Sequence, residues 1–309
     1  MNQIFEFITI GALAVVVSFV AMAGVLVLVT GTSPIVVKAW EALARARPRA
    51  TGRSSDTARL RGRMKRLARP TLLLTPATQP GVSRLGGDPD LPDGMAWPEL
   101  RGRPCAFLAQ IDLSALRSHA ALDWLPGAGQ LFAFVDLDGH GFADQVQVLF
   151  HDGPSGELRP PPARTPRFPE RRVAFEAYTS LPSLDWLGVD LAESDLSEGE
   201  LDELAELPGK PFGDEIQHRI GGYPSEIQDE QMAVACELIR RGLPPAHEGT
   251  QITPAILRAS KAWRLLLQID SDPALKMDWA DGGRLYVFVR EQDAKDSDFS
   301  ATITLSQSD

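Results

Sequence analysis

The chain has 309 residues, of which 44% are hydrophobic and 23% are charged. This composition is typical of a globular protein with a sizeable core, in one large domain or two small ones. The net charge of −10 argues against a nucleic-acid partner, and two cysteines, Cys105 and Cys236, are too few for a disulfide framework.

Charge is distributed unevenly along the chain. Residues 38–69 contain eleven basic and two acidic residues, whereas residues 70–309 contain 20 basic and 38 acidic residues, a net charge of −18. A basic segment therefore precedes a strongly acidic body. The basic segment either binds anionic lipid headgroups or serves as a solvated linker.

Residues 7–29 form an apolar run without a charged residue. A helix of this length reaches about 34 Å, enough to cross the hydrocarbon core of a bilayer. We expect a retained transmembrane helix rather than a buried core helix or a cleaved signal peptide. Because the nearby basic residues all follow the run, we expect residues 1–6 outside, a basic juxtamembrane linker at 30–70 and a cytoplasmic domain at 71–309. This is the topology of a single-pass protein of the bacterial inner membrane.

Three sequence blocks occur twice in the acidic body, in the same order. They are residues 83–89 and 218–224, residues 107–112 and 265–270, and residues 127–135 and 281–289. The duplication predicts two degenerate repeats, at about 71–153 and 173–309. The Pro-rich segment 154–172 between them is typical of an extended connector.

The same pattern predicts the elements of each repeat. The Gly-Gly block is a turn, because glycine adopts positive φ, and the apolar blocks are strands. Strands are expected at 107–112, 131–135, 146–150, 265–270, 285–289 and 299–305, and helices at 57–68, 113–122 (capped by Asp112), 194–207, 229–241 and 253–262. The predicted fold class is α+β, with two degenerate strand-rich repeats and peripheral helices, plus one N-terminal transmembrane α-helix.

One loop has the pattern of a cation site. Asp136, Asp138 and Asp144 stand at the first, third and ninth positions of a Gly-containing loop, which suits calcium. The fifth position is His140, a poor calcium ligand, and the acidic residue at the twelfth position of an EF-hand is missing. The alternative is an acidic hairpin turn without a metal.

The duplicated blocks resemble the YwqG-like family, the domain of unknown function 1963. The resemblance is carried by residues 218–224 with Gln228, and by residues 266–272, 277–283, 289–293 and 298–300. It covers about residues 71–309 and excludes the apolar run, the basic segment and the Pro-rich connector. The family has no established activity. Some relatives occur beside polymorphic toxin genes, which implies immunity or another protein-binding role.

The repeated turns supply one set of candidate binding residues. If the two turns face each other, a pocket between the repeats can present the guanidinium groups of Arg84 and Arg219 to a carboxylate or phosphate. Alternatively, each arginine pairs with Asp112 or Asp270 inside its own repeat, which is the interpretation we favour. The other candidates in this set are Asp88, Trp97, His218, Tyr223 and Gln228. His218 has the residue type of a general acid or base.

An acidic loop around Trp279 supplies the second set. Asp270, Asp272, Asp278 and Asp281 surround this tryptophan in the sequence. An exposed tryptophan among acids suits recognition of a basic protein, whereas a buried one would be part of the core.

These patterns lead to two functional hypotheses. The first is a cytoplasmic, membrane-anchored binding protein that engages a protein partner, with toxin immunity as one form of this role. The second is an enzyme or small-ligand receptor with its site between the repeats. The first is favoured, because the sequence has no nucleophile-elbow, zinc-protease, P-loop, dinucleotide-binding or Cys-x-x-Cys motif.

Overall fold

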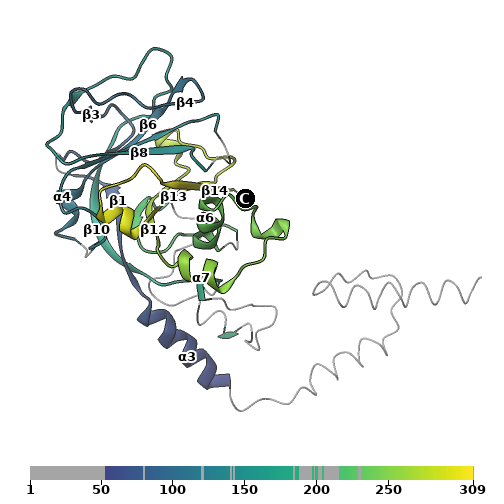
Figure 1. Cartoon of the computed structure of the whole chain (residues 1–309). Helices are drawn as coiled ribbons and strands as arrows, with labels where there is room; N and C mark the ends of the chain where they lie inside the picture. The colour runs from purple at the N-terminus through teal and green to yellow at the C-terminus, as the bar shows by residue number, and fades with distance from the viewer. Residues whose placement is uncertain are drawn as a thin grey trace, which may run out of the picture. The chain divides into compact units, whose positions relative to one another are not determined.

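The structure is a computed structural model that describes residues 53–308, except for 79–80, 120–121, 140, 142, 184, 188–196, 198, 201–203, 205–215 and 229–230 (Figure 1). The apolar run at 7–29 and residues 38–52 of the basic segment lie outside the described residues. Most of the helix expected at 194–207 lies outside them as well.

Strands dominate the described residues. They are β1 (Arg69–Pro76), β2 (Arg84–Leu85), β3 (Asp90–Leu91), β4 (Glu99–Leu100), β5 (Arg103–Pro104), β6 (Ala106–Asp112), β7 (Gln130–Val135), β8 (Val146–His151), β9 (Glu157–Leu158), β10 (Arg171–Ser180), β11 (Arg219–Gly221), β12 (Trp263–Asp270), β13 (Arg284–Arg290) and β14 (Ile303–Gln307). The helices are α3 (Arg53–Arg66), α4 (Leu113–Leu116), α6 (Met232–Arg240), α7 (Pro254–Ser260) and α8 (Glu291–Lys295), with 3₁₀ turns η1 (Asp185–Leu187), η2 (Ala246–Glu248) and η3 (Pro273–Leu275).

Ten strands form one sheet, in the order β14-β13-β12-β11-β1-β10-β2-β6-β7-β8. Its centre is the antiparallel pair β1 and β10, whose register runs from Arg69 opposite Ser180 to Pro76 opposite Val173. The order is palindromic: β2, β6, β7 and β8 on one side of this pair correspond to β11, β12, β13 and β14 on the other. Even the register shifts correspond, at Phe107/Ala109 and at Leu265/Leu267.

The sheet curls until its two end strands meet at one point. The backbone N–H of Thr304 donates to the carbonyl of Ala143 at 2.7 Å, and the N–H of Val146 donates to the hydroxyl of Thr304 at 3.1 Å. Because β8 and β14 form no strand ladder, the sheet approaches a barrel without closing. We call the line between β8 and β14 the seam.

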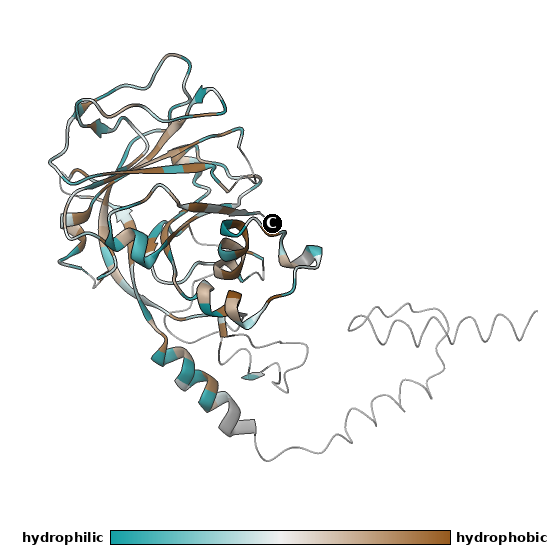
Figure 2. Cartoon of the chain, viewed as in Figure 1, coloured by the Kyte–Doolittle hydropathy of each residue, from teal (hydrophilic) through white to brown (hydrophobic). Residues whose placement is uncertain are grey.

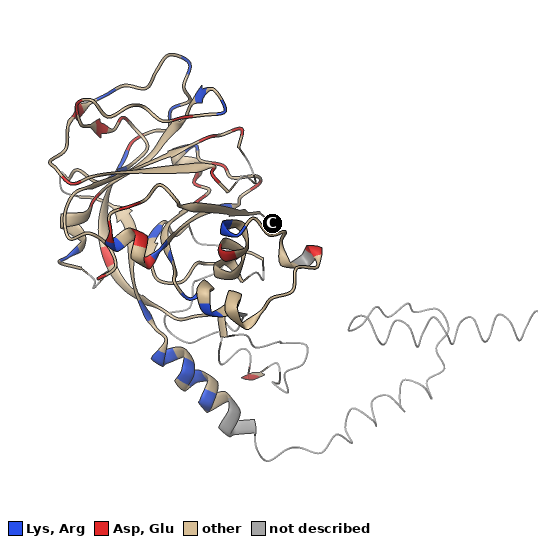
Figure 3. Cartoon of the chain, in the orientation of Figure 1, with Lys and Arg blue, Asp and Glu red and all other residues tan. Residues whose placement is uncertain are grey.

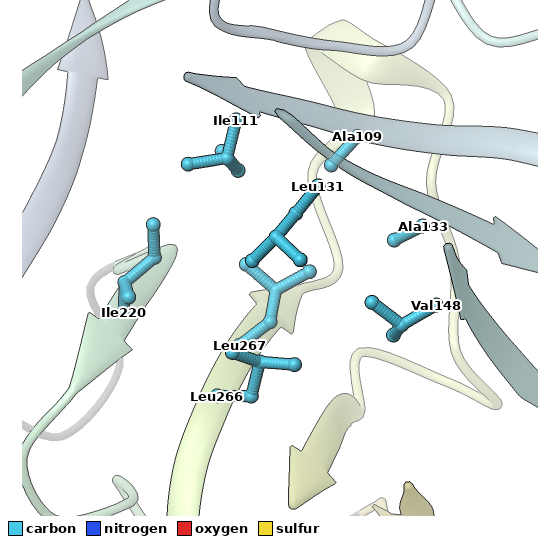
Figure 4. Close-up of a pocket in the computed structure, with 8 residues that line it drawn as sticks. All are labelled: Ala109, Ile111, Leu131, Ala133, Val148, Ile220, Leu266 and Leu267. Carbon is cyan, nitrogen blue, oxygen red and sulfur yellow. The ribbon is translucent and has the colours of Figure 1, made fainter. Parts of the chain in front are cut away.

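The core lies inside the curled sheet. Apolar side chains from both sides of the central pair pack there, and the strands are visibly more hydrophobic than α3 in Figure 2. An apolar cavity of about 20 Å³ remains between them (Figure 4), lined by Ala109, Ile111, Leu131, Ala133, Val148, Ile220, Leu266 and Leu267. With no polar group in its lining, this cavity is of the kind that stays dry.

The outer face of the sheet is covered differently on its two sides. In the first repeat, the loop around Leu91 and Leu100 packs on Phe107, Phe132 and Phe134. In the second repeat, α6 covers the corresponding face through Met232, Ala233 and Cys236, which pack with Trp263, Leu265, Tyr286 and Phe288. A helix therefore covers the outer face of the second repeat, whereas a loop covers the outer face of the first.

The predicted fold class is wrong. The strands form one nearly closed sheet instead of two strand-rich repeats with peripheral helices, and α3, with 14 residues, is the longest described helix. None of the described helices has the length and apolar character needed to span a bilayer. The sequence blocks could not show the single sheet, because β1 and β10, which join its halves, contain none of the repeated blocks.

The helix expected at 113–122 is also much shorter than predicted. Asp112 caps α4 as expected, its carboxylate accepting the N–H of Ser114 at 3.0 Å. The helix ends at Leu116 because the chain must turn to place Leu122 and Trp124 in the core.

Candidate functional site

Each half of the sheet carries the same hydrogen-bonded turn beside the central strand pair. In the first repeat, the buried side chain of Gln110 accepts the backbone N–H of Asp90 at 2.9 Å. In the second, the buried side chain of Gln268 accepts the N–H of Ser225 at the same distance. The duplicated sequence blocks thus produce duplicated contacts.

Two consecutive glycines make this turn in each repeat. Gly86 and Gly87 have φ of +61° and +75°, and Gly221 and Gly222 both have φ of +73°. At Gly86 a β-carbon would lie 2.3 Å from the carbonyl oxygen of Pro169. Glycine is therefore required for the backbone angle and for the close approach of the connector.

The motif arginines are buried and hold their own turns. Arg84 is ion-paired with Asp90 and donates to the carbonyl of Asp88 at 2.8 Å. Arg219 donates to the carbonyl of Tyr223 at 3.4 Å and to the side chain of Gln217. Neither arginine makes the ion pair that we expected: Arg84 pairs with Asp90 and not with Asp112, and no ion pair between described residues joins Arg219 to Asp270.

The second repeat differs in where its charges are paired. Burial lowers the pKa of Arg219 to about 10, against the favourable field of Asp270. Among the described residues, the ion pair of Asp270 is with Arg284, at 3.3 Å, and its carboxylate also accepts the N–H of Gln217 at 2.8 Å. Neither arginine presents a free guanidinium to a ligand.

His218 occupies the position that Ser83 has in the first repeat. The hydroxyl of Ser83 accepts the backbone N–H of Asp112 at 2.9 Å, and Nδ1 of His218 accepts the N–H of Asp270 at 3.2 Å. An acceptor at Nδ1 places the ring proton on Nε2, which lies 3.3 Å from Asp272. His218 is thus a neutral structural acceptor, and burial lowers its pKa despite the nearby carboxylates.

His218 is expected to make the domain sensitive to acid. Because its folded-state pKa is below the unfolded value of about 6.5, protonation favours unfolding, and this destabilisation sets in as pH falls below about 6.5. We predict that His218→Ser, which supplies the acceptor found at Ser83, reduces the loss of stability between about pH 7 and pH 5. Denaturant unfolding of both proteins across this range measures it. Equal losses in the two proteins would contradict the assignment.

The Pro-rich connector binds both repeats. Arg167 donates to Asp88 of the first repeat at 2.6 Å. The ring of Phe168 packs edge-on against Trp279 of the second repeat, with centroids 5.9 Å apart, and Arg171 is ion-paired with Asp272. The segment 154–172 is therefore more than a spacer, since its last residues tie the two repeats together.

The remaining candidates of the first set lie in separate places. Trp97 is half-buried, donates to the carbonyl of Cys105 at 2.9 Å and packs on the outer face. The hydroxyl of Tyr223 donates to the carbonyl of Leu67, also at 2.9 Å. The amide of Gln228 donates to the carbonyl of Ser308. No hydrogen bond between described residues joins Asp88 to His218 or Tyr223, which the repeated turns were expected to bring to one pocket.

Trp279 is buried, with 1% of its surface exposed, so the core alternative is correct. Only Asp278 and Asp281 of the four surrounding acids are exposed, at the turn between β12 and β13. The tryptophan itself is thus unavailable as an exposed anchor for a partner.

The acids of the predicted calcium loop are paired with arginines. Asp136 and Asp144 both bind Arg101, at 2.7 and 3.0 Å, and Asp138 is ion-paired with Arg103. Arg101 lies in the tight β4–β5 turn, and Arg103 is the first residue of β5. The described residues hold no cluster of three or more metal-ligating side chains. The calcium site stays a prediction.

The seam contains a groove that the sequence patterns did not indicate. It has a volume of about 400 Å³ and runs between β8 and the segment 297–302 that precedes β14. Its lining residues are Met95, Asp144, Val146, Gln147, Val148, Leu149, Phe150, Ser297, Asp298, Phe299, Ser300 and Thr302. Two of these lining residues, Phe150 and Phe299, have ring centroids 5.7 Å apart.

The groove combines apolar walls with carboxylates. Val146 and Val148 belong to the core, whereas Asp144 and Asp298 bring negative charge to the lining. Asp298 accepts the N–H of Ser300 at 2.9 Å and its hydroxyl at 2.6 Å, and these hydrogen bonds lower the pKa of Asp298, so it is ionised at neutral pH.

A second pocket, of about 470 Å³, lies between the β7–β8 loop and the connector. Its lining includes Arg103, Asp136, Asp138 and Arg164. The two aspartates are already ion-paired with Arg101 and Arg103, so this pocket offers less uncompensated charge than the groove at the seam.

The sequence pattern predicts strands at 146–150 and 299–305 but does not indicate the groove between them. The apolar alternation from Phe299 to Leu305 indicated one continuous strand, yet β14 begins only at Ile303. The Asp-x-Ser spacing at Asp298 and Ser300 was the available signal, because it forms a side-chain turn that bends the chain out of the sheet.

Comparison with known protein families gives a match over most of the chain. The family model described as "Domain of unknown function (DUF1963)" matches residues 83–307. This range contains both repeated turns, the connector and the seam. The finer YwqG-like naming is not tested by this match. No curated protein matches the sequence.

Proposed function

Since the chain belongs to the DUF1963 family, a domain family of unknown function, we propose a function from its structure: the domain binds a basic segment of a partner protein. The observation that carries this proposal is the groove at the seam. It joins an unpaired strand edge, an apolar lining and two carboxylates, those of Asp144 and Asp298.

The charge of the domain supports a basic partner. Residues 70–309 carry a net charge of −18, and Figure 3 shows acidic residues spread over the loops of the sheet, whereas α3 is basic. Such an excess attracts basic partners and repels acidic ones over a distance of about one Debye length. Immunity to a basic toxin would be one form of this function.

The buried polar groups support a binding function in a second way. Arg84, Arg219 and His218 have the residue types of ligand-binding or catalytic groups, but each is bonded within the sheet and its turns. Their role in the turns accounts for them without a substrate. The groove, by contrast, is lined by both polar and apolar groups that a ligand can reach.

A peptide selection tests the proposal. The full chain is presented with a displayed library of random decapeptides at about 0.05 M salt, and bound peptides are sequenced. We expect enrichment of lysine and arginine, and release of most bound peptides at about 0.5 M salt, where the Debye length falls to about 4 Å. A selected pool without basic enrichment, or binding that is insensitive to salt, would refute the proposed function.

A pair of charge-matched variants locates the binding. Asp144→Asn with Asp298→Asn removes two charges from the groove, and Asp278→Asn with Asp281→Asn removes two from an exposed turn elsewhere. We expect the first double variant to weaken binding of the selected peptides about tenfold and the second to weaken it less than threefold. Equal losses would place the binding outside the seam.

A further inference from the structure

We infer that the partner segment binds as an added β-strand along the open edge of β8, an inference that rests on the proposed function. Residues 146–150 of β8 all line the groove, so the groove runs beside this edge. Strand addition uses main-chain hydrogen bonds for affinity and alternate side chains for specificity.

The backbone of β8 points donors and acceptors into the seam. In an antiparallel strand, the N–H and C=O of one residue point to the same edge, and the edges alternate along the chain. The N–H of Val146 points away from β7, because it donates to Thr304. Val148 and Phe150 therefore point their N–H and C=O groups in the same direction. Within the part of the chain that the structure describes, no backbone hydrogen bond joins them to residues 297–302.

Local structure keeps the seam open. The chain leaves α8 through Ser297, which has φ of +61°, and the N–H of Asp298 donates to the carbonyl of Asp293 at 2.8 Å. Asp298 then bends the chain again by accepting the N–H of Ser300. These two turns hold residues 297–302 away from β8, so β14 cannot extend to complete the ladder.

The lining indicates the chemistry of the added strand. One face of the strand meets Val146, Val148 and Phe150, whose side chains face the core, so alternate residues should be apolar. At the positions between these apolar residues, the carboxylates of Asp144 and Asp298 favour lysine or arginine. Arg101 already compensates part of the charge of Asp144, which leaves Asp298 as the stronger partner for a cation. We therefore expect a strand of alternating apolar and basic residues.

The experiment uses an octapeptide of alternating lysine and valine, blocked at both ends, titrated against the full chain and followed by fluorescence anisotropy. A second peptide carries N-methyl groups on alternate residues along one edge, and a third carries them along the other edge. We expect one methylated peptide to bind at least tenfold more weakly than the parent. The other should bind about as well, because only one edge of an added strand faces β8.

Two proline variants of the protein, one in the groove and one outside it, provide a matched test of strand addition. Val148→Pro removes an N–H that faces the seam, and proline is tolerated on such an edge. Ser306→Pro removes the corresponding outward N–H of β14, which lies two residues beyond Thr304 and outside the groove lining. Both variants should retain cooperative thermal unfolding, and we expect only Val148→Pro to lose about tenfold in peptide affinity.

The outcomes separate this inference from the proposed function. If basic peptides bind, but neither methylation along either edge nor Val148→Pro weakens their binding, strand addition is wrong and the proposed function stands. If the alternating peptide does not bind while the library selects basic peptides, strand addition is again wrong. If the full chain self-associates through an edge that Val148→Pro blocks, the occupant is a second copy and the inference is overturned.

Discussion

Gly86→Ala is expected to lower the free energy of unfolding by about 3 kcal/mol, from backbone strain and overpacking together. Gly86 has φ of +61°, and a β-carbon there would lie 2.3 Å from the carbonyl of Pro169 and 2.9 Å from Cβ of Phe168. The added methyl group must push the connector away from the first repeat. Urea unfolding of the full chain measures this loss.

Gly94→Ala is the matched control for this substitution. Gly94 has φ of +80°, but no atom lies within 4 Å of the position that its β-carbon would take. This variant should show the backbone strain alone, about 1 kcal/mol. A loss at Gly86 no larger than at Gly94 would show that the connector does not need its close approach to the turn.

Arg84→Met is expected to destabilise the domain by about 3 kcal/mol or more, because it leaves a partly buried carboxylate without its counterion. Arg84 is 1% exposed and Asp90 15% exposed in their ion pair. The carbonyl of Asp88 also loses a donor. Chemical denaturation measures the change in the free energy of unfolding.

A double-mutant cycle separates the contribution of the ion pair between Arg84 and Asp90 from that of the other contacts of Arg84. In the background of Asp90→Asn, Arg84→Met should cost at least 1 kcal/mol less, since no charge is then left unpaired. Arg219→Met is an informative comparison, because Asp270, whose charge favours the Arg219 cation, is ion-paired with Arg284. We expect it to cost less than Arg84→Met. The reverse order would contradict this account of the two turns.

The sequence predicted local structure well where the repeated blocks impose it. The blocks around Arg84 and Arg219 form equivalent turns, and the strands that contain Gln110 and Gln268 form as expected. These sequence signals are all short-range: two consecutive glycines, an amide side chain inside an apolar run, and an alternation of apolar residues. They specify a turn or a strand before any distant contact is made.

These short-range signals could not predict contacts between segments that are distant in the chain. The pairing of β1 with β10 joins residues about one hundred positions apart, and no repeated block marks either strand. Trp279 is buried because Phe168, far away in a Pro-rich segment, packs against it. Acids around a tryptophan in the sequence cannot show such a partner. The groove depends on two successive bends before β14, which an alternating pattern conceals.

The palindromic strand order has a consequence for how the chain reaches this fold. β6, β7 and β8 follow one another as antiparallel neighbours, and so do β12, β13 and β14. These two meanders join strands that are close in the chain, so the entropy lost in closing their loops is small. The central pair joins Arg69 to Ser180 and closes a far longer loop. We therefore expect the meanders to form early and the central pair to form in the slow step, with amide protection appearing last along β1.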